Sequence, residues 1–204
     1  MNYFLSAVVG FFLGSIPTAY LIIKKYKNLD ITKEGSGNVG TLNSYEVSRS
    51  KLIGLAVLTI DFLKGLLSIF IVKTFFANNF QTLGFAFFFV ILGHCFSPWL
   101  KFKGGRGLAT AAGAASFFIP IVLFLWIVFW LVIKFIKNDI HFANVAATLL
   151  IIVISIVFPG TVNKFSFPQA ETNLLLSFTI SLTMLIILIK HWKPIKDYYY
   201  KHKK

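Results

Sequence analysis

Charged residues are scarce in this sequence. They make up 13% of its 204 residues, whereas about a quarter of a typical soluble domain is charged. Hydrophobic residues make up 57%, and 24 residues are phenylalanine. A soluble helical protein would need amphipathic stripes, and the apolar runs here have no polar face. The composition therefore excludes a soluble globular domain and indicates an integral membrane protein.

Cysteine and acidic residues are also nearly absent. The single cysteine, Cys95, excludes an intrachain disulfide framework and a cysteine-ligated metal cluster, so we expect no metal site. Seven acidic residues against twenty Lys and Arg leave a formal net charge of +13. Because the basic residues gather in clusters between apolar runs, membrane orientation accounts for most of this charge. We therefore do not expect the protein to bind nucleic acid.

Five apolar runs are long enough, or nearly so, to cross a bilayer, which takes about 20 residues. The first begins at Tyr3 with no basic segment before it and no evident cleavage site, so it is predicted to be a retained span and not a signal peptide. Spans are predicted at residues 3–23, 52–76, 81–99, 144–158 and 174–189. The short connection between the second and third spans predicts a tight helical hairpin.

Residues 108–133 form either one long helix or two crossings that turn at Ile119 and Pro120. The basic clusters at 24–51, 101–106, 134–137 and 190–204 favour the turn, because it places all four on one side of the membrane. The small residues of 108–116 suit a half-helix buried in protein. We therefore predict an all-α, polytopic integral membrane protein with about seven transmembrane or half-membrane helices. Its N-terminus lies outside and its C-terminus in the cytoplasm.

On this topology the chain is one membrane domain, 1–204, with cytoplasmic loops at about 24–51 and 100–107 and a basic cytoplasmic tail at 190–204. Both loops are rich in glycine, and such loops expose consecutive backbone N–H groups that can bind an anion. The second also carries Lys103 and Arg106, and the N-terminus of a helix predicted from Leu108 adds partial positive charge. The predicted phosphate ligands are Gly35, Gly37, Asn38, Gly40 and Asn43 in the first loop and Gly104, Gly105 and Gly107 in the second.

These patterns also allow simpler interpretations. The first loop could be a flexible polar turn, and Lys103 could extend to lipid headgroups. His94 is either a general base or a helix-terminal histidine bonded to a carbonyl. His191 is either a site residue or part of an aromatic belt at the membrane edge. Asp61 and Lys64, three residues apart inside a span, either pair with each other or mark a functional site.

Three stretches together resemble one family. They are Ser15-Ile-Pro-Thr-Ala-Tyr20, Gly35-Ser-Gly-Asn-Val-Gly-Thr-Leu-Asn43, and Gly93-His-Cys-Phe followed by Phe102-Lys-Gly-Gly-Arg-Gly-Leu-Ala-Thr110. In this order and at this spacing they strongly resemble the bacterial acyl-phosphate:glycerol-3-phosphate acyltransferases of the PlsY type. The resemblance runs from the first span to about Gly113 and extends more loosely to the C-terminus.

The resemblance implies a seven-helix enzyme of the bacterial cytoplasmic (inner) membrane that works in phospholipid biosynthesis. It would move a fatty acyl group from acyl phosphate to the sn-1 hydroxyl of glycerol 3-phosphate and give lysophosphatidic acid, with no cofactor. Its partners would be these two substrates and the lipid bilayer, and the sequence indicates no oligomeric state. The catalytic residues implied are Ser36, His94, Lys103, Arg106 and His191.

The sequence departs from the family pattern at the ends of two motifs. Glu46 stands where the family has an arginine, and Arg49 is the nearest replacement, which we assign to the phosphate site. Pro194 and Asp197 stand where the family has an asparagine and an arginine, and His141 and Asn144 replace a serine-bearing stretch. A paralogue with another acceptor is therefore an alternative, as is a non-catalytic anion-binding or headgroup-binding membrane protein or a small transporter.

Overall fold

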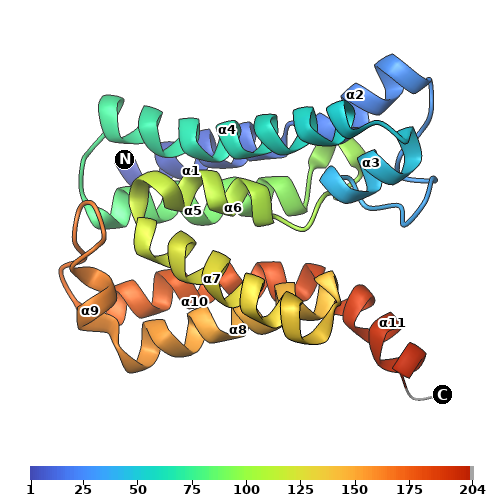
Figure 1. Ribbon diagram of the computed structural model, residues 1–204. Helices are drawn as coiled ribbons and strands as arrows, with labels where there is room; N and C mark the ends of the chain where they lie inside the picture. The colour runs from blue at the N-terminus through green and yellow to red at the C-terminus, as the bar shows by residue number, and fades with distance from the viewer. Residues whose placement is uncertain (203–204) are drawn as a thin grey trace.

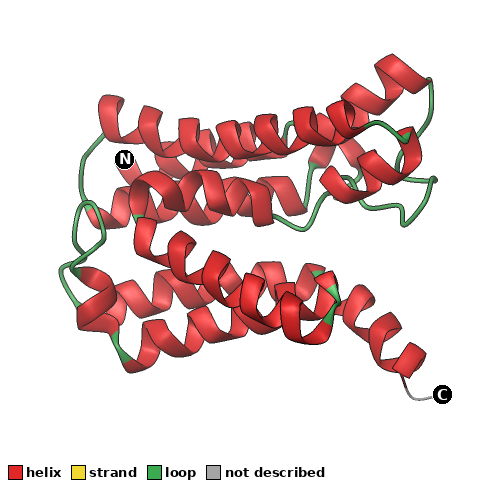
Figure 2. Cartoon of the chain, in the orientation of Figure 1, coloured by secondary structure: helices red, strands yellow, loops and turns green. Residues whose placement is uncertain are grey.

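The computed structural model describes residues 1–202, so the last two residues of the predicted tail lie outside the described part. Within that part the regular structure is entirely helical (Figures 1 and 2). The helices are α1 (Asn2–Ser15), α2 (Thr18–Lys27), α3 (Thr41–Ser48), α4 (Lys51–Phe75), α5 (Phe80–Cys95), the 3₁₀ helix η1 (Pro98–Leu100), α6 (Leu108–Phe118), α7 (Pro120–Lys137), α8 (Ile140–Val157), α9 (Pro159–Asn163), α10 (Asn173–Lys190) and α11 (Trp192–His202).

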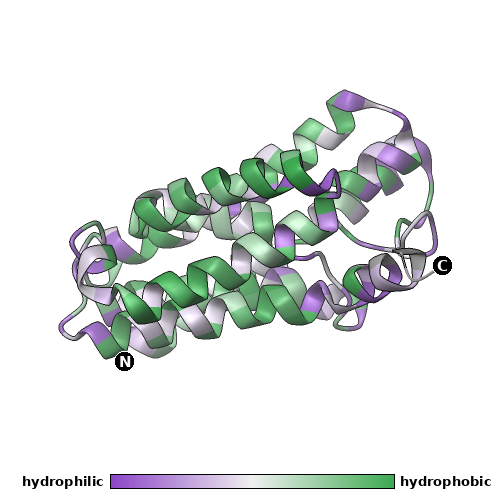
Figure 3. Ribbon diagram, turned by 60° about the horizontal axis from the view of Figure 1, so that its bottom comes forward, coloured by the Kyte–Doolittle hydropathy of each residue, from purple (hydrophilic) through white to green (hydrophobic). Residues whose placement is uncertain are grey.

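Six helical segments of the described chain are long and apolar enough to cross a membrane, and α6 is a shorter apolar helix. The spanning segments are Asn2–Lys27, Lys51–Phe75, Phe80–Leu100, Pro120–Lys137, Ile140–Val157 and Asn173–Lys190. Apolar residues fill the middle of the long helices, and polar residues collect at their ends and in the loops (Figure 3). The predicted all-α membrane fold with about seven transmembrane or half-membrane helices is confirmed.

The chain turns at Ile119 and Pro120, as the distribution of basic residues predicted. Ile119 leaves the helical conformation with φ −139° and ψ 69°, and α7 begins at Pro120. The 11 residues of α6 extend about 16 Å, which is about half of the hydrocarbon core. Gly65 and Gly113 let α4 and α6 approach until a Cβ on either glycine would overlap the backbone of the other helix. α6 is thus a half-length helix packed closely on α4.

The predicted basic segments meet at one end of the bundle. Figure 1 shows α2, α3, the α7–α8 connection and α11 at the same end. The N-terminus, the α4–α5 loop and α9 lie at the opposite end. The turn after α6 produces this arrangement, because it reverses the direction of every later helix.

A break at Pro17 divides the first span into α1 and α2. The helix α1 ends at Ser15 before this proline, so the last carbonyl groups of α1 have no intrahelical donor and need other partners. Ser97 Oγ donates to Ser15 O at 2.6 Å, and Lys64 Nζ donates to Ile16 O at 3.0 Å. Trp99 Nε1 donates to Ser15 Oγ at 3.0 Å. The break therefore ties α1 to α4 and to the segment that follows α5.

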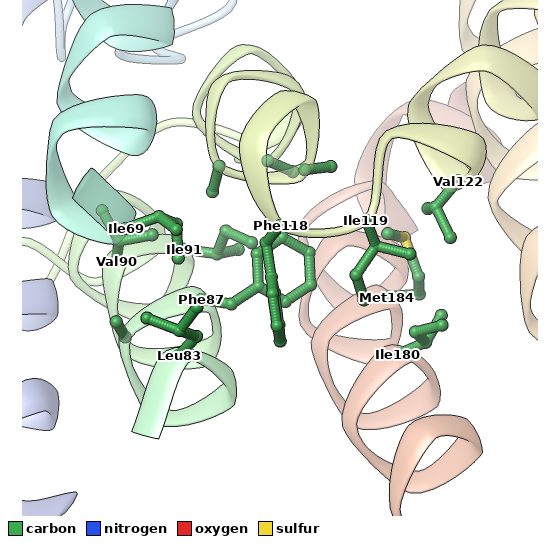
Figure 4. Close-up of a cluster of buried hydrophobic side chains, with 14 of the residues drawn as sticks. Ile69, Leu83, Phe87, Val90, Ile91, Phe118, Ile119, Val122, Ile180 and Met184 are labelled. Carbon is green, nitrogen blue, oxygen red and sulfur yellow. The ribbon is translucent and has the colours of Figure 1, made fainter. Parts of the chain in front are cut away.

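Buried aromatic and aliphatic side chains of α5, α6 and α10 pack against one another inside the bundle. Phe118 lies between Phe87 of α5 and the side chains of α10, and its ring centroid is 5.9 Å from that of Phe87 (Figure 4). Ile180 and Met184 of α10 complete this cluster on the other side. The cluster fixes the position of α6 relative to α5 and α10, and the candidate site lies at the opposite, N-terminal end of α6.

Candidate functional site

The first glycine loop is organised by one buried amide. The Asn43 side chain, 1% exposed, accepts a hydrogen bond from Ser36 N at 2.9 Å. Its Nδ2 donates to the carbonyl oxygens of Glu34 at 3.1 Å and Asn38 at 2.9 Å. Gly35 has φ 56° and Gly37 has φ 71°, conformations that other residues adopt at a cost. Asn43 therefore holds the shape of the loop, while the exposed Ser36 lies at its surface.

The second glycine loop folds back onto the end of α5. Gly105 N donates to His94 O at 3.1 Å, which ties the loop to the last turn of the helix. A Cβ on Gly104 would overlap the carbonyl oxygen of His94, and one on Gly105 would overlap the imidazole at Nε2. Gly107, with φ 85°, then leads into α6. The glycines are required here because the loop backbone lies directly against His94.

Arg106 lies at the centre of the candidate site. Its half-buried side chain extends toward α8, where Nη1 is 3.4 Å from Nδ1 of His141. Burial lowers the pKa of the guanidinium, and the Glu46 carboxylate opposes this shift. Because a guanidinium titrates far above neutral pH, Arg106 remains a cation. It is therefore a fixed, partly desolvated positive charge at the level of the loops.

Arg106 lines two cavities. The first, of about 320 Å³, is polar and opens at the loop end of the bundle; its lining residues are Ser36, Arg106, Asp139, His141, Lys193, Pro194 and Asp197. The second, of about 170 Å³, lies deeper and is lined by Asn38, Asp61, His94 and His191 among others. The deeper cavity shares Leu58, Leu108 and Ala109 with an apolar groove of about 750 Å³ between α4, α6 and α7. The polar cavity, the deeper cavity and the apolar groove thus lie next to one another, and Arg106 lies between the first two.

His94 sits in a buried polar junction. The imidazole is on a residue only 7% exposed, and its Nδ1 is 3.1 Å from Thr110 Oγ1 and 3.7 Å from Asp61 Oδ1. Lys64 Nζ forms an ion pair with Asp61 Oδ1 at 2.8 Å. Asp61 and Lys64 therefore pair with each other, which is one of the two predicted alternatives, and Asp61 also lines the deeper cavity.

His191 belongs to a hydrogen-bond chain that crosses three helices. Trp130 Nε1 of α7 donates to Asn144 Oδ1 of α8 at 2.7 Å. Asn144 Nδ2 lies 3.4 Å from His191 Nε2, and His191 Nδ1 lies 2.8 Å from Ile187 O. Because a carbonyl oxygen only accepts, Nδ1 carries the proton and Nε2 accepts from the amide. The neutral imidazole therefore fits this chain, and a doubly protonated one would leave two donors facing each other at Asn144.

Protonation of His191 is expected to make the fold less stable at acid pH. Burial lowers the pKa of its imidazole to about 4, while the Ile187 carbonyl oxygen opposes this shift. Its stabilising contribution is present above about pH 6.5, the unfolded value, and is lost as pH falls toward 4. We expect the melting temperature in detergent to fall more steeply between these values for the wild-type protein than for His191→Gln. If the melting temperatures of the two proteins fell equally with pH over this range, this expectation would be contradicted.

The structure brings together only part of the predicted site. The predicted residues that line the two cavities are Ser36, Asn38, Gly40, His94, Arg106, Gly107 and His191. The predicted residues that do not line them are Gly35, Gly37, Asn43, Arg49, Lys103, Gly104 and Gly105. Lys103 and Arg49 are exposed, and Arg49 ends α3 in the left-handed conformation with φ 52°.

The residues at the site that sequence reasoning did not find include two tryptophans and two charged residues, Trp126, Trp130, Asp139 and Lys193. The tryptophans had a usable signal, because a spacing of four residues puts both on one face of a helix. Trp126 Nε1 donates to Thr148 Oγ1 at 3.1 Å, parallel to the Trp130 contact with Asn144. Among the described residues, no group of three or more His, Cys, Asp or Glu could hold a metal ion.

Comparison with known proteins places these features in a family. Residues 4–201 match the family model described as glycerol-3-phosphate acyltransferase. Glycerol-3-phosphate acyltransferases of Streptococcus pyogenes, from strain Manfredo (serotype M5) and strain NZ131 (serotype M49), are each 31% identical to this chain over 191 residues. Each alignment covers 94% of this chain and 87% of the relative.

Two crystal structures share the fold. Both are of PlsY, an integral membrane glycerol 3-phosphate acyltransferase, and both are 28% identical to this chain. The glycerol 3-phosphate form superimposes with a TM-score of 0.80 over 98% of this chain and 94% of that structure. The lysophosphatidic acid form gives 0.77 over 98% and 93%. The resemblance seen in three stretches of the sequence is confirmed, and this chain belongs to the glycerol-3-phosphate acyltransferase family.

Proposed function

We propose that this protein transfers a fatty acyl group from acyl phosphate to the sn-1 hydroxyl of glycerol 3-phosphate and releases phosphate and lysophosphatidic acid. The position of Arg106 carries this proposal, because it lines both the polar cavity and the deeper cavity. The deeper cavity in turn shares walls with the apolar groove. A reaction that joins a phosphorylated polyol to a fatty acyl chain requires such a junction.

The chemistry makes modest demands on the protein. An acyl phosphate is a mixed anhydride and is already activated, so no covalent enzyme intermediate is needed. The acceptor hydroxyl oxygen attacks the carbonyl carbon, and the bond from this carbon to the phosphate oxygen breaks. Phosphate leaves with that electron pair, and the hydroxyl proton passes to phosphate or to water. The protein has to orient the two substrates and neutralise developing negative charge.

Each part of the site has a role in this proposal. The Arg106 guanidinium binds phosphate oxygens, and the hydroxyl of Ser36 and the amide of Asn38 hydrogen-bond the polar substrate. The acyl chain lies in the apolar groove against Leu58 and Trp126. The exposed Lys103 draws anionic substrates toward the loop, and Arg49 adds to the same positive field. Gly40 and Gly107, the loop glycines that line the deeper cavity, supply backbone N–H groups, and Asn43, His94 and His191 hold the walls in place.

Direct assay tests the proposal. Purified protein in detergent is incubated with palmitoyl phosphate and labelled glycerol 3-phosphate, and lysophosphatidate is measured. A parallel incubation with palmitoyl coenzyme A tests the donor, and we expect product only with the acyl phosphate. Product only from the thioester would contradict the donor assignment. The absence of product from both donors would contradict the proposed activity.

One observation supports a second candidate, the transfer of the acyl group to a different acceptor. Two carboxylates, Asp139 and Asp197, line the polar cavity beside its cations, and Glu46 acts electrostatically on Arg106. Carboxylates accept hydrogen bonds from hydroxyl groups and repel phosphate. An acceptor with more hydroxyl groups and less negative charge than glycerol 3-phosphate would fit beside these carboxylates.

Reversing the charge of Glu46 separates the two acceptors. If the acceptor is glycerol 3-phosphate, Glu46→Arg should lower its KM about two- to fivefold, the range of an exposed charge pair. The gain should shrink as salt rises, because exposed charges are screened. Glu171→Arg changes net charge equally but lies before α10 at the other end of the bundle, so it should leave KM unchanged. If Glu46→Arg instead loses activity on an uncharged, hydroxyl-bearing acceptor and gains none on glycerol 3-phosphate, the hydroxyl-rich acceptor is favoured.

We further propose that the protein is one membrane domain of the bacterial cytoplasmic membrane. The loops at 24–51 and 100–107 and the tail at 190–204 then face the cytoplasm, where the positive-inside rule puts them. A reporter fused after Lys204 should behave as cytoplasmic, and one inserted at Asn163 as extracytoplasmic. If both reporters lie on the same side, this topology is wrong.

A further inference from the structure

An ion pair inside the membrane lies beside the candidate site. Asp61 of α4 is 2% exposed and Lys64 is 5% exposed, with Lys64 Nζ 2.8 Å from Asp61 Oδ1. Buried charges at this depth are costly unless they are paired. Lys64 has a structural role of its own, because it donates at 3.0 Å to Ile16 O at the break between α1 and α2. Asp61 neutralises this lysine at a point where the backbone break already holds the lysine in place.

Asp61 faces His94 as well as Lys64. Its Oδ1 is 3.7 Å from His94 Nδ1, and Thr110 Oγ1 of α6 is 3.1 Å from the same nitrogen. A negative carboxylate and a hydroxyl oxygen around Nδ1 favour the imidazole form that carries its proton there, because the partner of one ring nitrogen sets the tautomer. The lone pair of Nε2 then points the other way, toward the second glycine loop.

The other edge of the imidazole supports that loop. Gly105 packs so closely on His94 Nε2 that a Cβ would overlap the ring, and Gly105 N donates to His94 O at 3.1 Å. The next residue is Arg106. A tilt or flip of the imidazole would therefore move the backbone that carries the guanidinium, and displacements of about 1 Å at a reacting site can cost about a hundredfold in rate.

We propose that Asp61 is a positioning residue that acts through His94. It fixes the tautomer and the orientation of the imidazole. The imidazole in turn fixes the backbone position of Gly105 and Arg106. Asp61 thus couples a charge inside α4 to the loop that binds phosphate, without itself contacting the reacting atoms. This inference rests on the proposed function, because the role of the loop is to hold Arg106 against a phosphate group.

The tautomer can be measured in the wild-type protein without any activity assay. ¹⁵N-histidine-labelled protein in detergent gives separate imidazole nitrogen signals, and those of His94 are assigned by their loss in His94→Gln. We expect a proton on His94 Nδ1 near neutral pH. A bare Nδ1 would overturn the proposal, whether or not the protein proves to be an acyltransferase.

A charge-balanced variant separates positioning from stability. Asp61→Asn alone leaves Lys64 uncompensated, whereas Asp61→Asn combined with Lys64→Gln removes both charges and keeps a donor near Ile16 O. We expect the double variant to melt close to the wild type but to lose about tenfold or more in kcat/KM, the scale of one displaced charge-assisted bond. Full recovery of activity in the double variant would show that the ion pair only stabilises the fold, and would overturn the proposal.

A triple variant tests whether the effect passes through His94. If it does, adding His94→Gln to the charge-balanced pair should lower activity no further than His94→Gln alone, because residues that act as a unit are not additive. Multiplicative losses would show that Asp61 acts independently of the imidazole and would overturn the proposal. Should the double variant not fold, the tautomer of the wild-type imidazole still decides the question.

Discussion

Replacing Arg106 by alanine is expected to lower kcat/KM for glycerol 3-phosphate by roughly tenfold to a hundredfold. The guanidinium lines both the polar cavity and the deeper cavity, and it is half-buried, so its bond to a phosphate is made away from bulk water. A hydrogen bond to a charged group contributes about 1.5–3 kcal/mol, which corresponds to this loss of affinity for the transition state. The measurement is steady-state kinetics on purified protein with palmitoyl phosphate as the donor.

Two further variants make this result specific. Arg106→Lys keeps the charge and loses the planar fork, so it should fall between the wild type and Arg106→Ala. Lys101→Asn removes another cation of the same loop, and asparagine tolerates the left-handed conformation found there, φ 54°. Lys101 is exposed and does not line either cavity, so this variant should keep its activity. Unchanged kcat/KM in a folded Arg106→Ala protein would reject the role of the guanidinium.

Local signals predicted the fold well and the boundaries of its elements less well. The spans follow from apolar runs, and the turn after α6 follows from Pro120 and the one-sided basic clusters. The short helix α3 was missed because Thr41–Ser48 has no apolar stripe to bury. The start of α8 was placed four residues late, at 144 instead of 140. The missed signal was Asp139, whose side chain caps the helix by accepting from Phe142 N at 2.8 Å.

The candidate site was predictable where it is local in sequence. Each glycine loop is contiguous, so its capacity to bind an anion could be inferred from residue types alone. The contacts that join α7, α8 and α10, such as Trp130 to Asn144 and Asn144 to His191, depend on how the helices pack. No spacing along the chain specifies those pairs, because the partners are 14 and 47 residues apart. The same limit applied to the walls of the polar cavity, where Lys193 and Asp197 come from α11.

Gly105→Ala is expected to abolish most of the activity and to lower the stability of the fold. A Cβ at this position would overlap the His94 imidazole and would lie 2.7 Å from the backbone oxygen of Val39 in the first loop. Neither neighbour can move freely, because the imidazole is buried and Val39 is part of a backbone held by Asn43. The new methyl group must therefore push the second loop outward.

That displacement acts on catalysis more than on folding. Overpacking in a well-packed interior costs typically about 1–3 kcal/mol of stability, which a bundle of this size can tolerate. Arg106 follows directly in the chain, however, and a shift of about 1 Å in a group that orients the substrate can cost about a hundredfold in rate. We therefore expect Gly105→Ala to remain folded in detergent, with a lower melting temperature and a loss of kcat/KM at least as large as that of Arg106→Ala.

The matched control for this variant is Gly160→Ala at the other end of the bundle. A Cβ there would approach Asn173 at no closer than 3.7 Å, an ordinary van der Waals distance, so both melting temperature and kinetics should stay near the wild type. Measuring both alanine variants side by side separates the effect of adding a methyl group from the effect of where it is added. If Gly105→Ala kept wild-type kcat/KM, the loop would not need its close contact with His94. The link from that contact to Arg106 would then be wrong.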